Sequence, residues 1–370
     1  MGDAIGNISN VGLSGHSLGK KHAGLIIREQ DPVNLEFPFD QLDSFLTPND
    51  LFYVRSHFTR PVLEQADYRL TVDGAVEEPF SLSYGQLQDL PAVTRPATLE
   101  CAGNGRVYLV PQVRGAQWQL GAVSTAEWTG VPLSTVLDRA RVTANACEIV
   151  LQGADQGTPK EEPIPPTKIH YALGFPLTKA KDVVLAYAMN GQELGKDHGY
   201  PVRAVVPGYY GMASVKWLTH IHVVEMPFQG YFQISDYAYW DFEAGNPVRR
   251  PIREMLVKSA IARPTTREVI EAGSEYRVSG AAWSGAAAVS QVEVSTDGGH
   301  EWKPARFIDG EKPFVWRRWE FEWKVPSRKG RYILMSRATD KDGNVQPDQH
   351  DRSFGTYVIH HTLPVEIEVQ

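Results

Sequence analysis

The last third of the chain alternates polar and apolar residues in short segments, and this pattern restricts it to β-structure. The segments are Tyr276–Trp283, Val289–Ser295, Trp302–Ile308, Trp316–Val325 and Arg331–Thr339. Alternation with a period of two is typical of strands that bury one face. Asp297-Gly298-Gly299 is a typical hairpin turn between two of them. We therefore expect residues 251–370 to form an all-β, immunoglobulin-like sandwich.

The preceding residues 36–250 mix strand patterns with short helical patterns. Strands are expected at Tyr68–Gly74, Glu148–Gly153, Val183–Met189 and Val202–Val206. Ser134–Ala140 begins with a capping residue and continues as an amphipathic helix. These patterns predict a mixed α+β domain with long functional loops. A polar, glycine-rich N-terminal arm precedes it over residues 1–35, and the composition of Gly245–Pro251 indicates a linker after it.

Composition excludes several classes of protein. The chain has 370 residues, a net charge of −7 and no basic run, which argues against a nucleic-acid partner. Two cysteines without a CxxC pair provide no disulfide framework and no attachment site for haem or an iron–sulfur cluster. No apolar run reaches the length of a membrane span, so no membrane association is expected. Without a signal peptide the protein is expected in the cytoplasm, or in the periplasm if an export signal was removed.

The loop Thr98–Arg106 contains one of the two cysteines, Cys101. Gly103 and Gly105 carry no Cβ, so the backbone here can approach a bulky ligand closely. Arg106 would lower the pKa of the thiol and favour the thiolate, which is the form that binds metals. The alternative is a buried structural cysteine beside an ordinary turn.

Cationic side chains recur in the loops and strand ends of the first domain. They are Arg55, His57, Arg106, Arg114, His198, Arg203 and Lys216. Leu51–His57 is rich in β-formers, and as a strand it would point Arg55 and His57 to one face. Together with a thiolate, these cations indicate a site for something anionic, because guanidinium groups suit phosphate and oxyanion geometry.

His220 and His222 form an HxH pair that could ligate zinc. The sequence shows no third or fourth ligand at a suitable spacing, so polar packing on a strand face is the favoured interpretation. GxGxxG after a strand, the P-loop, GxSxG and HExxH are all missing, which argues against the enzyme classes that use these motifs.

Four stretches together resemble the sulfite oxidase family of molybdenum-cofactor (molybdopterin) oxidoreductases. They are Phe52–His57, Glu100–Arg106, Asp197–Arg203 and Ser214–Leu218, and the resemblance runs from about Phe37 to about Pro347. Val292–Gly299 and Arg337–Pro347 resemble the family's immunoglobulin-like dimerisation domain, which implies a homodimer. The fold implied for residues 36–250 is the sulfite-oxidase-type molybdopterin domain, and the cofactor is molybdenum–molybdopterin, with no haem or flavin in this chain.

The resemblance implies roles for eleven residues. Cys101 would be the thiolate ligand of molybdenum. The residues matching positions that hold the pterin and its phosphate are His57, Asp155, His198, Arg203, Ser214 and Lys216. Those matching the substrate pocket are Arg55, Arg106, Trp118 and Tyr237. Trp118 would wall this pocket, and Tyr237 would offer a hydroxyl to it.

The implied reaction is oxidation of sulfite to sulfate by oxygen-atom transfer, with electrons passed to a separate acceptor such as a c-type cytochrome. Two departures weaken the case for sulfite: Gly105 stands where the family commonly has an arginine, and residues 348–355 lack the family's Trp-Asn-Leu-Arg-Gly stretch, for which Arg352 is a candidate substitute. The alternatives are a nitrate reductase-like reaction, a sulfoxide substrate, or a β-rich binding protein that has lost the cofactor.

Overall fold

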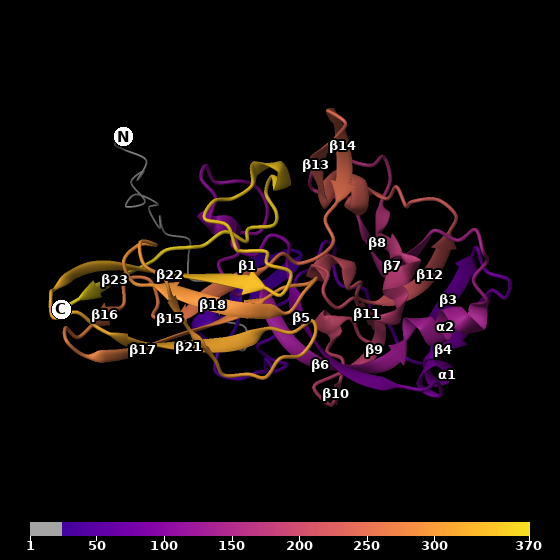
Figure 1. Cartoon of the computed structure of the whole chain (residues 1–370). Helices are drawn as coiled ribbons and strands as arrows, with labels where there is room; N and C mark the ends of the chain where they lie inside the picture. Colours follow the sequence, from indigo (N-terminus) through magenta and orange to yellow (C-terminus); the bar gives the residue numbers. More distant parts are fainter. Residues whose placement is uncertain (1–23) are drawn as a thin grey trace.

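The computed structural model describes residues 24–370, and this part of the chain is built mainly from strands (Figure 1). Its two α-helices are short, α1 (Tyr84–Gln88) and α2 (Leu133–Ala140). Single turns of 3-10 or π helix connect the strands: η2 (Phe39–Gln41), η3 (Arg106–Tyr108), η4 (Leu177–Lys181), η5 (Lys196–His198), η6 (Gly211–Ala213), η7 (Phe232–Asp236) and η8 (Arg352–Phe354). Among the described residues no helix is long and apolar enough to cross a bilayer.

Two five-stranded sheets form the first half of the molecule. One has the order β10-β9-β6-β5 with β11 also paired to β9; its strands are β5 (Val93–Glu100), β6 (Val123–Pro132), β9 (Val184–Met189), β10 (Gln192–Glu193) and β11 (Arg203–Val205). The other has the order β4-β3-β12-β7-β8; its strands are β3 (Arg69–Gly74), β4 (Phe80–Ser83), β7 (Glu148–Gly157), β8 (Ile169–Pro176) and β12 (Leu218–Val224). β3 and β12 run parallel, and the other pairs are antiparallel. The strands expected here all form.

Two more sheets form the second half, drawn in orange and yellow in Figure 1. The first has the order β15-β17-β21-β20, made of β15 (Lys258–Arg263), β17 (Glu275–Trp283), β20 (Arg306–Phe307) and β21 (Arg317–Lys324). The second has the order β16-β23-β22-β18-β19, made of β16 (Val269–Ile270), β18 (Val289–Ser295), β19 (Lys303–Pro304), β22 (Gly330–Asp340) and β23 (Val365–Val369). Val278, Val292, Trp319 and Leu334 come from both sheets and belong to one buried core. Trp302–Ile308, expected as one strand, is divided into β19 and β20, which pair in different sheets.

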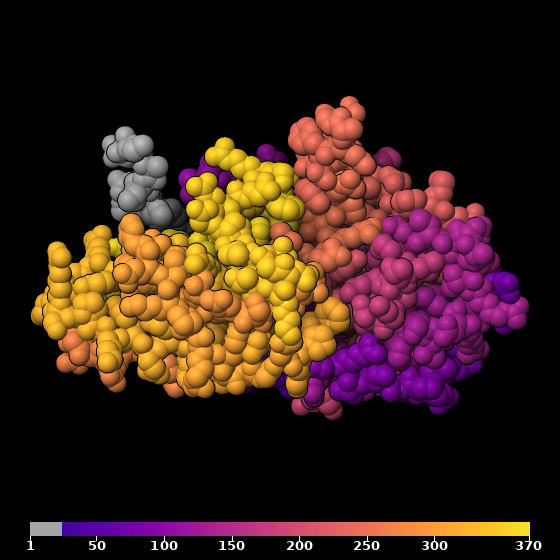
Figure 2. All heavy atoms as spheres, viewed as in Figure 1, coloured from indigo at the N-terminus to yellow at the C-terminus, as the bar shows by residue number. Residues whose placement is uncertain are grey.

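Two segments near the ends of residues 36–250 form hairpins, so the expectation of a linker at Gly245–Pro251 is wrong. Residues 1–23 of the predicted arm lie outside the described residues, and the rest of it contains a hairpin of β1 (Ile26–Gln30) and β2 (Val33–Glu36). The predicted linker is the second strand of a hairpin, β13 (Ala238–Glu243) and β14 (Asn246–Pro251), which stands out from the surface (Figure 2). Its turn forms because Ala244 and Gly245 both adopt positive φ, the geometry of a tight hairpin.

Leu51–His57, although rich in β-formers, makes only an isolated bridge between Val54 and Leu35. Side chains take up backbone groups that a ladder would need: Ser56 N–H donates to Asn34 Oδ1 at 2.7 Å, and Tyr53 N–H donates to Ser124 Oγ at 3.3 Å. The segment therefore crosses the molecule as extended loop.

A buried ion pair joins the two halves. Lys258, at the start of β15, donates from Nζ to Glu100 Oε1 at 2.8 Å, and both side chains are 2% exposed. Trp283 Nε1 donates to the other carboxylate oxygen at 2.8 Å, and Asn104 Nδ2 donates to Oε1 at 3.0 Å. All polar atoms of the carboxylate are thus satisfied, as a buried charge requires. The C-terminal half is thereby attached directly beside Cys101.

Lys258→Met should lower the free energy of unfolding by about 3–5 kcal/mol, because it leaves the Glu100 charge buried and unpaired. Adding Glu100→Gln should restore part of this loss. Lys341→Met is the matched control, since Lys341 is 55% exposed in its pair with Glu311 and should cost less than about 1 kcal/mol. Urea denaturation measures all three. Equal losses for Lys258→Met and Lys341→Met would contradict the importance of the buried pair.

Candidate active site

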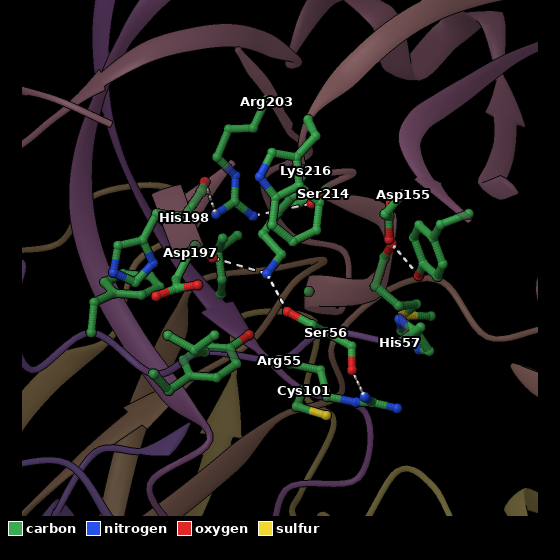
Figure 3. A pocket seen from close by; sticks show the side chains of 18 of the residues that line it. Arg55, Ser56, His57, Cys101, Asp155, Asp197, His198, Arg203, Ser214 and Lys216 are labelled. Carbon is green, nitrogen blue, oxygen red and sulfur yellow. Dashed lines mark hydrogen bonds between the residues drawn. The ribbon is translucent and has the colours of Figure 1, made fainter. Parts of the chain in front are cut away.

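Two adjoining cavities meet at four shared residues: Arg55, His57, Cys101 and Tyr237 line both. The first cavity extends toward Asp155, His198, Arg203, Ser214 and Lys216 (Figure 3). The second extends toward Arg106, Arg114, Lys160, Asp236 and Tyr357. The structure thus brings together ten of the eleven predicted site residues around one thiol.

Trp118 is the exception. Its side chain is 0% exposed and packs in the core cluster that also contains Cys101, and it lines neither cavity. Its backbone carbonyl accepts from Val107 N–H at 3.2 Å, beside the Arg106 turn. Trp118 therefore supports the loop from beneath.

Cys101 follows the last residue of β5 and begins a tight turn, in which Asn104 N–H donates to the Cys101 carbonyl at 2.8 Å. Burial raises the pKa of the thiol, and this outweighs the opposing effect of Arg55 and Arg106. The two cations therefore lower this pKa as expected, but they do not make the thiolate the favoured form in the protein alone. A soft metal ion would displace the proton directly, because a coordinating thiol is deprotonated by the metal charge.

Arg106 is held rigidly between two glycines. Its Nη1 donates to the Ala116 carbonyl at 3.0 Å, and its Nε donates to the Thr356 carbonyl at 3.1 Å. A Cβ on Gly103 would lie 2.4 Å from Nη2, and one on Gly115 would lie 2.7 Å from Nη1. Gly103 thus makes room for the Arg106 guanidinium. No local pattern in the sequence indicated this role for the glycine.

Gly105 adopts φ +97°, and a Cβ there would lie 3.0 Å from Ile359 Cγ2. Val358 N–H donates to the Ala102 carbonyl at 2.7 Å, so the C-terminal segment packs directly on the loop. Arg352 is exposed and lines a separate hollow with His350 and His361. It lines neither cavity around Cys101, so the missing cationic charge is not replaced by Arg352.

Arg203 and Lys216 make the far end of the first cavity strongly cationic (Figure 3). Arg203 donates to the carbonyls of His198 and Ser214, both at 3.0 Å. Lys216 Nζ donates to Ser56 Oγ at 2.8 Å and to the Asp197 carbonyl at 2.9 Å. Within residues 24–370 neither cation forms an ion pair within 4.0 Å, so the buried Arg203 and the half-buried Lys216 both lack a counter-ion.

The pKa values reflect this shortage of negative charge. Burial and then Arg203 lower the pKa of Lys216 to about 7. Burial lowers the pKa of Arg203 to about 10, and burial with Arg203 lowers that of His198 to about 4. Burial raises the pKa of Asp155 to about 7, against the opposing effect of Lys216. An anion bound here would stabilise the charged form of both basic groups.

His57 and Tyr237 form a hydrogen-bonded pair at the junction of the cavities, with His57 Nε2 2.6 Å from the Tyr237 hydroxyl. His57 stacks on Tyr171 at 4.4 Å between ring centroids. Burial, Arg55 and Lys216 lower the pKa of His57, so the imidazole is neutral near pH 7. Burial raises the pKa of Tyr237, which therefore keeps its proton. The pair can hold or relay one proton without changing its net charge.

Sequence reasoning did not find four polar residues of the site: Ser56, Asp197, Asp236 and Tyr357. Tyr357 donates to Asp236 Oδ1 at 2.5 Å, and the Arg106 guanidinium lies 5.0 Å from the Tyr357 ring centre. Ser56 and Asp197 stand inside stretches that carry the family resemblance and were identifiable from it. No local signal marks Tyr357, which lies 251 residues after Arg106 in the sequence.

Two family models and several curated proteins match this chain. Residues 57–232 match the family model "Oxidoreductase molybdopterin binding domain", and residues 249–367 match "Mo-co oxidoreductase dimerisation domain". The chain is 38% identical over 349 residues to mitochondrial sulfite oxidase of Homo sapiens, covering 89% of this chain but 62% of that protein. It is 33% identical over 358 residues to sulfite oxidase of Arabidopsis thaliana, covering 89% of each.

A solved structure agrees with these matches. The crystal structure of the sulfane dehydrogenase SoxCD from Paracoccus pantotrophus superposes with a TM-score of 0.80 at 28% identity, covering 98% of this chain and 92% of that chain. The chain belongs to the sulfite oxidase family of molybdopterin oxidoreductases, which confirms the resemblance.

Sulfate should bind cofactor-free protein at the Arg203–Lys216 end about tenfold more weakly at pH 8 than at pH 6. Sulfate keeps its charge over this range, whereas Lys216, with a pKa of about 7, loses its proton. Ionisation of Asp155 acts in the same direction. Isothermal titration calorimetry measures the affinities. Lys216→Arg should reduce the pH dependence to the part that Asp155 contributes, because a guanidinium stays charged; an unchanged dependence in that variant would refute the assignment to Lys216.

Proposed function

We propose that the protein is a molybdenum-dependent oxidoreductase that oxidises sulfite to sulfate and passes the electrons to a separate acceptor, such as a c-type cytochrome. The observation that carries the proposal is the position of Cys101, a buried thiol where a cation-rich cavity meets a second, arginine-lined cavity. The chain spans 62% of the length of the first mammalian relatives, so the reaction and its partners are inferred for this part.

The first cavity fits the molybdenum cofactor. Arg203 and Lys216 would pair with the phosphate, whose negative charge supplies the missing counter-ion. Ser214, His198, His57 and Asp155 would hold the pterin through hydrogen bonds, and Cys101 would ligate molybdenum through a soft thiolate. When bound, the cofactor supplies oxygen-atom transfer and accepts two electrons from the substrate.

The second cavity fits a small oxyanion. Arg55 and Arg106 would attract and orient it, and the two backbone carbonyls that fix Arg106 let it act without reorganisation. In the neutral His57–Tyr237 pair, the Tyr237 hydroxyl would donate a hydrogen bond to the oxyanion without adding charge. Asp236 adds a carboxyl group to this wall, which limits the net positive charge of the pocket.

A second sulfur substrate is the main alternative. This cavity is less cationic than a strict sulfite site would be. Gly105, packed against Ile359, supplies no charge, and Arg352 lies outside the cavity. Asp236 adds a carboxyl group to the wall. The structural relative SoxCD is named a sulfane dehydrogenase, which supports oxidation of a less charged sulfur compound. A nitrate reductase-like or sulfoxide reaction remains a further alternative. Arg203 and Lys216 in the first cavity have no ion-pair partner among the described residues, which argues against a cofactor-free binding protein.

The domain organisation completes the proposal. We assign residues 36–250 to the molybdopterin domain and residues 251–370 to an immunoglobulin-like dimerisation domain, after an N-terminal arm. The match of residues 249–367 to a dimerisation domain supports a homodimer. Two facing sheets around one core support the immunoglobulin-like description.

Cys101→Ser should abolish sulfite-dependent reduction of an artificial electron acceptor, a loss of at least ~1,000-fold if the thiolate is essential, while circular dichroism stays unchanged. Cys147→Ser is the matched control, because Cys147 lines neither cavity. Metal analysis of wild-type protein from a host that makes the cofactor should find molybdenum. Wild-type activity in Cys101→Ser would refute the ligand assignment, and a larger rate with nitrate or a sulfane donor than with sulfite would replace the substrate.

A further inference from the structure

Three metal-ligating side chains converge on the outer face of β3 and β12, away from both cavities. His220 Nε2 lies 2.9 Å from Asp73 Oδ1, and His222 Nδ1 lies 2.5 Å from the same oxygen. The three atoms all lie within 4.8 Å of one another. None of these residues lines a cavity around Cys101. The HxH pair therefore has the third ligand that the sequence did not show.

The pairing of the two strands produces this cluster. Residues two apart on a strand share a face, which places His220 and His222 together. β12 runs parallel to β3 with His222 opposite Asp73 and His220 opposite Thr71, so Asp73 stands beside one histidine and diagonal to the other. A turn within one segment could not produce this contact, because Asp73 is 147 residues from His220.

The space beside the cluster is kept open by a glycine. Gly74 has φ +92°, and a Cβ there would lie 3.0 Å from His222 Nδ1 and 2.1 Å from the Val223 carbonyl. The side chains of Asp73, His220 and His222 are 38%, 29% and 47% exposed, so an ion can enter from solvent. Two imidazoles and one carboxylate with an open fourth position form a donor set typical of Zn²⁺.

We propose that Asp73, His220 and His222 bind one divalent transition-metal ion, Zn²⁺ in the first instance, which bridges β3 and β12. The ion would bind Asp73 Oδ1, His220 Nε2 and His222 Nδ1, which now share hydrogen bonds, and each neutral imidazole would carry its proton on the other ring nitrogen. The ion would fix the start of β12, and Lys216 of the cationic cavity lies four residues before His220. The site is separate from the proposed molybdenum centre and does not depend on it.

Titration of the EDTA-treated full chain with ZnCl₂ tests this site. The Cys101→Ser background removes the thiol as a competing ligand. Calorimetry should find a site that His222→Gln and Asp73→Asn each weaken by at least ~10-fold, the lower limit for loss of even an outer-shell partner. The same two substitutions should remove the rise in melting temperature that ZnCl₂ produces.

His300→Gln is the matched control, because His300 is exposed and lies outside the cluster; it should leave the zinc affinity unchanged. Glutamine and asparagine preserve hydrogen bonding at these exposed positions, and circular dichroism checks that the variants fold. Zinc binding of equal affinity in His222→Gln, Asp73→Asn and the parent would overturn the proposal, as would absence of binding in the parent. Either result leaves the oxidoreductase proposal untouched.

Discussion

The buried pair between Lys258 and Glu100 is the interaction on which the arrangement of this protein depends. A charge taken out of water must be paired and hydrogen-bonded, and here the partner comes from the other half of the chain. Because Glu100 immediately precedes Cys101, the same contact that joins the halves also positions the thiol. The C-terminal half is therefore part of the active-site framework, even though it contributes few residues to the cavities.

The cavity beside this joint has the opposite electrostatic character. Arg203 is buried and Lys216 half-buried, neither has a carboxylate within ion-pair distance among the described residues, and loss of solvent lowers the pKa of each. Such an arrangement costs stability in the protein alone and is typical of a site built for a charged ligand. Cys101 is likewise in a less favourable state without a ligand. Burial raises the pKa of its thiol, which keeps its proton until a metal ion displaces it.

Errors in predicting the fold have a common cause. Leu51–His57 is rich in β-forming residues, but the side chains of Asn34 and Ser124 accept hydrogen bonds from its backbone N–H groups. Turn-forming residues suggested a linker at Gly245–Pro251, but they lie in a hairpin. Local composition records which conformations a segment tolerates, whereas the hydrogen-bond partners that select one of them come from distant parts of the chain.

Sequence alone was enough to predict most of the long strands of the second half, the cysteine loop with its glycines and, through four stretches that resemble it, the family. Those features are local, since alternation, turn residues and short motifs are written in consecutive positions. Tertiary packing alone places Tyr357 and Asp236 beside Arg106 and gives the histidine pair its third ligand, Asp73. These contacts join residues more than a hundred positions apart, and only the packing of strands, not any spacing in the sequence, brings them together.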